Sequence, residues 1–167
     1  MHMMIDIETL GVGESAPLFQ IGACAFEPKG EVCDAIGIDV NLLDVILKTG
    51  FLPQKETVAW WQTQRFPFLG NEKSLTKSLA MLNEFFIQYK PEFVWANSPS
   101  FDLVILRRHY EAIGMTPLWL YWQELDQRTA KWIYSSVNGN APSRGNVSHD
   151  AKDDAVDQVN YLNKLLP

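Results

Sequence analysis

Met4-Ile5-Asp6-Ile7-Glu8-Thr9-Leu10-Gly11 is the stretch that decides how the rest of the chain is interpreted. Its apolar, β-forming start and its closing glycine predict a strand followed by a turn. Because residues two apart on a strand point to the same face, Asp6 and Glu8 direct their carboxylates into one small volume. A bound Mg²⁺ or Mn²⁺ would relieve their repulsion, since both ions prefer oxygen ligands. The alternative is a solvated strand end, so a metal site requires further acids from elsewhere in the chain.

Length and composition predict a single domain over residues 1–167. The hydrophobic fraction is 47% and the charged fraction 20%, as in globular proteins. No apolar run approaches the ~20 residues that span a bilayer, and the first residues do not resemble a signal peptide, so we expect a cytoplasmic protein without a membrane partner. Cys24 and Cys33 lack the spacing of a zinc site. A net charge of −6 weighs against nucleic-acid binding, although acids that hold metal ions would contribute to it.

Hydrophobic patterning predicts an α/β fold that begins with an antiparallel meander of three strands. A later short strand, set between helices, is expected to add a parallel part to the sheet. The segment 41–50 fits either a short helix or an irregular connection, and 135–148 is expected to be a loop because it is rich in Ser, Asn and Gly. The other expected elements are strands near 4–9, 18–26, 32–40 and 93–96, and helices over 74–89 and 101–113 and from 126 and 149 onward.

Two later segments bring polar groups that suit the same chemistry. Asp102 lies in the first turn of a helix, just beyond the carboxyl end of strand 93–96, where α/β sheets place ligands. His149 opens the acid-rich start of the last helix, in which Asp153 follows it by four residues and Asp154 by five. A lone His at a helix start is ordinarily a surface residue, whereas one that leads several acids after a loop is a candidate for catalysis.

The helix from Thr57, its expected N-cap, carries the adjacent tryptophans Trp60 and Trp61. Side chains of neighbouring helical residues point to different sides, so we expect one core ring and one partly exposed ring. Trp61 is our candidate for stacking on a base, although either ring could do so and both could be core. Asp126 is expected to cap the next helix, and Arg128 either binds a phosphate or pairs with an acid, which is the interpretation we prefer.

These segments resemble the three exonuclease motifs of the DEDDh family, an RNase H-like superfamily that includes proofreading exonucleases, oligoribonuclease and RNase T. Residues 6–11 resemble motif I, residues 97–103 resemble motif II, and residues 149–155 resemble the His-x-Ala-x-x-Asp-Ala sequence of motif III. The resemblance implies an RNase H-like mixed β-sheet flanked by α-helices. Residues 57–61 and 126–129 further resemble the phage exonuclease A-like and prophage exonuclease VIII-like branch, which suggests a phage or prophage origin.

The resemblance also assigns roles. It implies that two divalent ions, Mg²⁺ or Mn²⁺, are held by four carboxylates, that His149 is the general base, and that Thr9 and Leu10 contact the terminal nucleotide. The family spacing selects Asp154 over Asp153. The implied catalytic residues are Asp6, Glu8, Asp102, His149 and Asp154, with the four acids as metal ligands and with Thr9, Leu10, Trp61 and Arg128 as substrate-binding candidates.

The chemistry supports these roles. Phosphodiester hydrolysis must stabilise charge on the attacking and leaving oxygens, which two metals about 3.5–4 Å apart can do, and Asp6 is best placed to bridge them. An imidazole titrates near pH 6.5 and therefore suits a base at neutral pH. We expect stepwise 3′→5′ release of nucleoside 5′-monophosphates from single-stranded nucleic acid, with DNA favoured.

Two other functions stay open. The same fold could trim RNA ends or short oligoribonucleotides, because no residue reveals how a 2′-hydroxyl is received. A non-catalytic nucleic-acid-binding domain is the third interpretation, and the presence of all five motif residues argues against it. The chain could also form a homodimer, since the aromatic segment 119–122 suits either an interface or the core.

Overall fold

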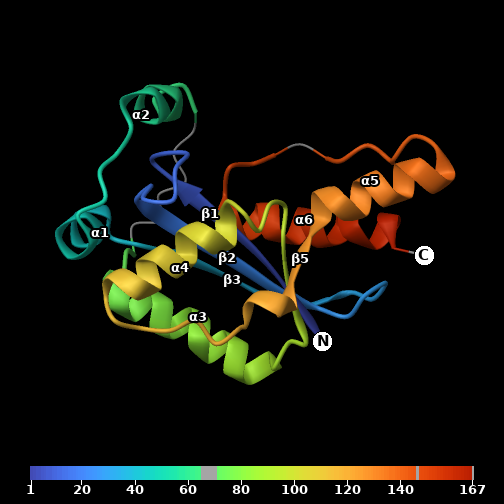
Figure 1. Cartoon of the computed structure of the whole chain (residues 1–167), viewed down its shortest axis with the longest axis horizontal. Helices are drawn as coiled ribbons and strands as arrows, with labels where there is room; N and C mark the ends of the chain where they lie inside the picture. The colour runs from blue at the N-terminus through green and yellow to red at the C-terminus, as the bar shows by residue number, and fades with distance from the viewer. Residues whose placement is uncertain (65–70, 146, 167) are drawn as a thin grey trace.

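The structure, a computed structural model, describes residues 1–64, 71–145 and 147–166. Its centre is a five-stranded mixed sheet in the order β3-β2-β1-β4-β5 (Figure 1). β1, β2 and β3 pair antiparallel and β4 continues the sheet in parallel from β1, as the sequence predicts, whereas the parallel strand β5 beside β4 was not expected. The strands are β1 (His2–Thr9), β2 (Leu18–Phe26), β3 (Val32–Asp39), β4 (Phe93–Ala96) and β5 (Glu124–Asp126).

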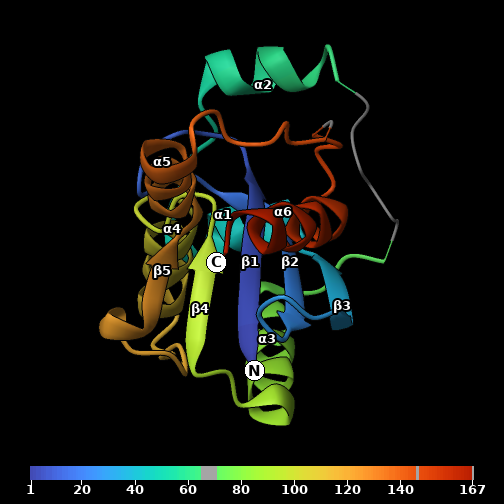
Figure 2. The same ribbon diagram turned by 90° about the vertical axis from the view of Figure 1, so that its right-hand side faces the viewer.

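Helices cover both faces of this sheet. In Figure 2, α6 crosses in front of the strands, α1 and α3 lie behind them, and α2 stands beyond the carboxyl end of β1. Tyr121–Gln123 forms a short 3₁₀ turn, η1, before β5. The helices are α1 (Leu42–Thr49), α2 (Lys55–Trp61), α3 (Leu75–Tyr89), α4 (Asp102–Ala112), α5 (Gln127–Asn138) and α6 (Ala151–Leu165). No helix in the described part of the chain is long and apolar enough to cross a membrane.

Alternation along β1 explains where the first two acids point. Met3, Ile5 and Ile7 belong to the core cluster under α1, α3 and α4, whereas Met4 belongs to the cluster under α6. Asp6 and Glu8 lie on the same face of β1 as Met4, because side chains two residues apart on a strand share a face. The two carboxylates therefore emerge where apolar packing on the α6 face ends.

Gly22 allows α6 to approach the sheet beside these acids. It pairs with Asp6 in the β1–β2 ladder, and a Cβ at this position would lie 1.9 Å from the Ala151 carbonyl oxygen. Gly37, the partner of Gly22 on β3, also lies beneath α6 but less tightly, since a Cβ there would be 3.2 Å from the Lys152 Cβ. Only glycine leaves room for the first turn of α6 at this depth.

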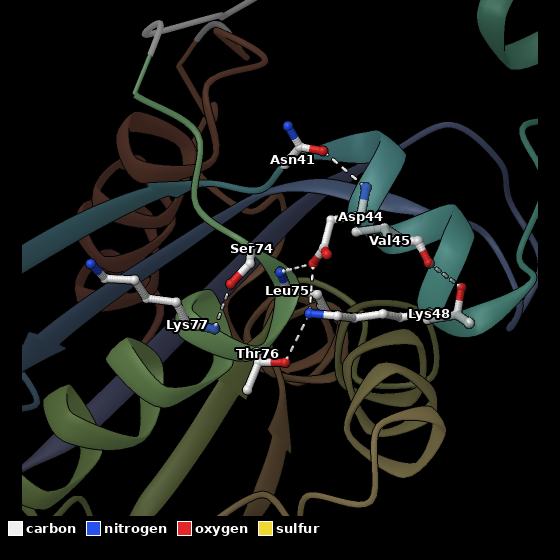
Figure 3. Close-up of polar contacts among 9 residues, drawn as sticks. Asn41, Asp44, Val45, Lys48, Ser74, Leu75, Thr76 and Lys77 are labelled. Carbon is white, nitrogen blue, oxygen red and sulfur yellow. Dashed lines mark hydrogen bonds and ion pairs between the residues drawn. The ribbon is translucent and has the colours of Figure 1, made fainter.

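A polar junction fixes α1 against α3 on the opposite face (Figure 3). The Asn41 side chain caps α1 by accepting a hydrogen bond from the Asp44 amide, at 2.9 Å. Asp44 then accepts one from the Leu75 amide, at 2.7 Å, and pairs with Lys48, at 3.0 Å. Lys48 also donates to the Thr76 hydroxyl, so the start of α3 is held by both side chains.

Several boundaries differ from the sequence-based expectations. The open segment 41–50 is helical, α2 begins at Lys55 with Gln54 as its N-cap instead of Thr57, and α5 continues through residues 135–138 of the expected loop. Within that loop, residue 146 lies outside the described residues. The last helix begins at Ala151, because the Asp150 carboxylate caps it by accepting from the Lys152 and Asp153 amides.

Candidate active site

The expected catalytic side chains converge on one cavity of about 240 Å³ beside the carboxyl ends of β1 and β4. We call it the acidic cavity. β1, the start of α4 and the start of α6 each contribute carboxylates from distant parts of the sequence. It is lined by Asp6, Ile7, Glu8, Asn97, Ser98, Phe101, Asp102, Arg128, Arg144, Val147, His149, Asp154 and Gln158.

Asp6 lies at the centre of the acidic cavity. Burial raises the pKa of its carboxyl well above the ordinary value, and the nearby Asp102 and Glu8 carboxylates add to the shift. The Gln158 side chain opposes it by donating a hydrogen bond to Asp6 Oδ1 at 2.5 Å. Gln158 is itself buried on α6, so this bond ties the strand that carries the acids to the helix above it.

Glu8 faces the second group of acids. Burial raises its pKa to about 8, and the carboxylates of Asp154, Asp102 and Asp150 contribute in that order. One ligand atom each from Glu8, His149 and Asp154 lie within 4.8 Å of one another. Oxygen and imidazole donors at this spacing suit a divalent cation, whose charge would also relieve the carboxylate repulsion.

Asp102 is the first residue of α4 and is buried. Burial raises its pKa to about 7, while backbone N–H groups of Ser98 and Ile7 and the charge of Arg128 favour the ionised form. Its Oδ2 accepts from the Ser98 amide at 3.3 Å. The loop after β4 therefore supports the carboxylate that faces the acidic cavity.

Asp154 holds the loop that carries His149. Its Oδ1 accepts from the Ser148 amide at 2.8 Å and the Ser148 hydroxyl at 3.0 Å, and its Oδ2 accepts from the His149 amide at 3.0 Å. His149 has a φ of +57°, which non-glycine residues rarely adopt. The expected helical spacing from His149 is therefore wrong, because this residue precedes the cap of α6. Asp153 is exposed and lies outside the acidic cavity.

A second hollow of about 490 Å³, the aromatic cavity, adjoins the acidic one and shares Ile7, Glu8 and Phe101 with it. The His149 ring lies edge-on to both tryptophans, with centroids 4.9 Å from Trp60 and 5.9 Å from Trp61. The other residues lining the aromatic cavity are Thr9, Gly11, Val12, Gln54, Glu56, Thr57, Trp60 and Trp61.

The structure separates the two tryptophans as expected. Trp61 is 2% exposed and donates from Nε1 to the Thr9 carbonyl at 3.0 Å, so it fixes the end of β1. Trp60 is 42% exposed and offers the larger free ring surface. Leu10 packs in a buried cluster with Phe19 and Trp61 and lines neither cavity, and its expected contact with a terminal base stays a prediction.

Arg128 lies at the start of α5, which Asp126 caps as expected by accepting from the Arg128 amide. Its guanidinium lines the acidic cavity near enough to favour the ionised form of Asp102. Within residues 1–64, 71–145 and 147–166 it makes no ion pair within 4 Å, and the choice between binding a phosphate and pairing with an acid stays a prediction.

Sequence reasoning missed two buried glutamines. Gln158 contacts Asp6 as described above. Gln20 on β2 accepts from the Ala151 amide at 2.8 Å and donates to Asp150 at 3.3 Å, which places the start of α6 on the sheet. The one sequence signal for Gln20 is a polar residue inside an otherwise apolar strand, since Leu18 and Phe19 precede it and Ile21 follows. Such a residue requires a buried partner.

A family profile described as the 3′-5′ exoribonuclease Rv2179c-like domain matches residues 1–166. A comparison with curated protein sequences gives no match.

Solved structures show the same fold. The structure of E. coli exonuclease I in complex with a dT13 oligonucleotide matches with a TM-score of 0.68 and 15% identity, over 97% of this chain and 39% of that chain. The complex of ExoI with SSB-Ct matches with a TM-score of 0.71, 15% identity and coverage of 98% and 40%. This chain thus spans about two fifths of the length of these proteins. The nuclease domain of 3′hExo, a DEDDh family member bound to rAMP, matches with a TM-score of 0.57 and 10% identity, over 98% of this chain and 90% of that chain. The sheet and flanking helices are therefore those of RNase H-like exonucleases.

Proposed function

Because the chain belongs to the Rv2179c-like 3′-5′ exoribonuclease domain family, we propose that it is a metal-dependent 3′→5′ exonuclease that releases nucleoside 5′-monophosphates from single-stranded nucleic acid. The observation that carries this proposal is the convergence of Asp6, Glu8, Asp102, His149 and Asp154 on the acidic cavity. Side chains more than 140 residues apart in sequence would not gather as uncompensated acids without a cationic partner.

The donor set of the acidic cavity fits divalent cations. Asp6, Glu8, Asp102 and Asp154 would hold two Mg²⁺ or Mn²⁺ ions. Burial raises the pKa of the first three carboxyls, and a bound cation would favour their ionised forms. When bound, such ions stabilise charge on the attacking and leaving oxygens and acidify water. Gln158 orients Asp6, and the Ser98 amide orients Asp102, for this role.

His149 is the proposed general base. Its backbone is held by the bond from its amide to Asp154, and its ring packs edge-on against Trp60 and Trp61. The imidazole thereby stays at the mouth of the acidic cavity, where it can take the proton of the attacking water. Trp60 is thus both a wall of the aromatic cavity and a support for the base.

The aromatic cavity is the proposed site of the 3′-terminal nucleoside. Its wall combines the exposed ring of Trp60 with Thr9 and backbone near Gly11, which suits a base and a sugar more than a charged group. Trp61 would support this wall from behind, and Leu10 would support it from the buried cluster. Arg128 and Arg144 would contact the phosphate from the acidic cavity.

RNA is the first substrate to test. The sequence led us to favour DNA, and that preference stays a prediction, whereas the family description favours RNA. The resemblance of residues 57–61 and 126–129 to the phage branch, and pairing as a homodimer, also stay predictions. In the described structure Trp119 is core, while Tyr121 and Trp122 are exposed.

Digestion of matched 5′-labelled RNA and DNA strands with Mg²⁺ or Mn²⁺ tests the proposal. We expect a ladder that shortens from the 3′ end, that disappears with EDTA, and that Asp6→Ala lacks. Shortening from the 5′ end would refute the polarity. Binding of the strand without any digestion, at all metal concentrations, would favour the non-catalytic interpretation.

A further inference from the structure

A third cavity, of about 420 Å³, adjoins the acidic cavity on the side away from the aromatic one. It lies between the start of α5 and the loop that precedes α6, and α6 forms a further wall. Figure 1 shows α5 and α6 side by side. We call it the basic cavity. It is lined by Asn97, Gln127, Arg128, Lys131, Arg144 and Tyr161.

Three cations gather in the basic cavity, although the chain as a whole carries a net charge of −6. In the described residues, the side chains of Arg128, Lys131 and Arg144 make neither an ion pair within 4 Å nor a side-chain hydrogen bond. Arg128 acts on Asp102 across the wall that is shared with the acidic cavity, but the three cations still repel one another, so an anionic ligand would stabilise this arrangement.

The wall of the basic cavity contains a buried hydroxyl without a partner. Tyr161 on α6 is 4% exposed, and its Oη makes no hydrogen bond to any described residue. Burial raises the pKa of this phenol, and the charge of Arg144 opposes that shift, so the two groups lie close together. A buried donor that lacks an acceptor costs free energy, and a phosphate oxygen would supply that acceptor.

The three cavities form a row. The acidic cavity shares Ile7, Glu8 and Phe101 with the aromatic cavity, and Asn97, Arg128 and Arg144 with the basic cavity, whereas the two outer cavities share no residue. A strand whose terminal nucleoside lies in the aromatic cavity and whose scissile phosphate faces the acids must leave on the remaining side.

We propose that the basic cavity binds the phosphodiester one nucleotide to the 5′ side of the scissile bond, so that the enzyme grips the strand that remains after each cut. This proposal rests on the proposed exonuclease function. Arg128 and Arg144 lie on the shared wall and therefore contact both phosphates, whereas Lys131 and Tyr161 belong to the basic cavity alone.

Short substrates test the proposal. In a trinucleotide NpNpN the first cut has an upstream phosphate, whereas the dinucleotide NpN has none. We expect the wild type to have a kcat/KM about tenfold higher on the trinucleotide, as for one charge-assisted contact. A neutral methylphosphonate at the first linkage should remove that advantage, because it removes the charge and keeps the extra nucleoside.

The variant Lys131→Gln tests whether the upstream phosphate binds in the basic cavity. We expect the ratio of kcat/KM on the two substrates to fall about threefold to tenfold, and the slope of log(kcat/KM) against log salt on a longer strand to flatten by about 0.7, as for one lost phosphate contact. Lys131→Arg should restore both values. Lys77→Gln removes an exposed lysine from α3, on the other face of the sheet, and should change neither.

The possible outcomes separate the exonuclease function, the binding of the upstream phosphate and its assignment to the basic cavity. If the wild type cuts neither these substrates nor the longer strand, the exonuclease proposal fails, and if it cuts the longer strand alone, the inference fails while the exonuclease function stands. If it cuts both at equal kcat/KM, the upstream phosphate is not bound and the inference fails while the exonuclease function stands. If the methylphosphonate removes the advantage but Lys131→Gln keeps the wild-type ratio and salt slope, the phosphate binds elsewhere and the assignment to the basic cavity is refuted.

Discussion

Replacing Glu8 by glutamine should stabilise the metal-free protein at alkaline pH while it removes the activity. In the folded chain, burial first and the neighbouring carboxylates second raise the pKa of Glu8 from 4.5 to about 8. An unfolded chain loses this proton near pH 4.5. Between these values the folded state binds more protons, so the free energy of unfolding falls as pH rises and stays low above pH 8.

The size of the effect follows from the shift. A rise from 4.5 to about 8 corresponds to about 5 kcal/mol of lost stability if the cavity were dry. The acidic cavity is open to water, which screens the charges, so we expect about 2 kcal/mol. Glutamine keeps the shape of the side chain and cannot ionise. For a chain of this length the gain corresponds to a Tm increase of about 4–8 °C at pH 9.

Thermal unfolding in EDTA, followed by circular dichroism at pH 5 and pH 9, measures this difference. We expect Glu8→Gln to melt near the wild type at pH 5 and above it at pH 9. Mn²⁺ should raise the Tm of the wild type more than that of the variant, because the ion binds the carboxylate. Glu84→Gln, at an exposed position of α3, is the matched control and should melt like the wild type at both values. Equal melting of Glu8→Gln and wild type at pH 9 would refute the crowding of carboxylates around Glu8.

Three further substitutions test the surrounding structure. His149→Ala should lower kcat at least about 100-fold in the strand-digestion assay while the circular dichroism spectrum is unchanged, because it removes the proposed base; full activity across neutral pH would contradict the assignment. Gly22→Ala should lower the free energy of unfolding, measured by urea denaturation, by about 3 kcal/mol, because the added Cβ would overlap the Ala151 carbonyl. Gly13→Ala is the control, because its Cβ would meet only the end of the Gln54 side chain, at 3.7 Å. Trp61→Ala should cost about 3–5 kcal/mol of stability, whereas Trp60→Ala should chiefly raise KM and lower kcat; the reverse pattern would show that the wrong ring was assigned to the substrate.

Local rules were enough for the first acids. Two-residue periodicity places Asp6 and Glu8 on one face whatever the rest of the chain does, and the structure shows the apolar side chains of β1 alternating around them. Asp102 could also be placed, because the carboxyl end of a buried parallel strand is a position that the topology defines. The mixed sheet itself followed from three meander strands and a later strand set between helices.

Contacts between distant side chains could not be predicted in the same way. Gln20 and Gln158 join the sheet to α6 through side-chain hydrogen bonds, and their partners are more than 130 residues away in sequence. No periodicity or capping rule identifies the partner of a buried amide. Which tryptophan faces inward likewise depends on the Thr9 carbonyl, which accepts from Trp61 and leaves Trp60 at the surface.

The start of the last helix shows a competition between two local rules. A helix that began at His149 would have placed this residue one turn before Asp153. Asp150 is the better N-cap, however, because its carboxylate reaches the Lys152 and Asp153 amides. This cap leaves His149 outside the helix with a left-handed backbone, and it turns Asp154 inward.

Under the proposed function, Asp154 therefore has two roles that a single substitution cannot separate. Both its oxygens already accept hydrogen bonds from residues 148 and 149, and the same carboxylate is a proposed metal ligand. Carboxylate oxygens can accept from more than one partner, so both functions are compatible. Loss of activity in Asp154→Asn would combine weaker metal binding with a displaced His149, whereas loss in Asp102→Asn would leave the His149 loop intact. The position of the base and the charge of the metal site are thus coupled through one side chain, and the comparison of these two variants measures that coupling.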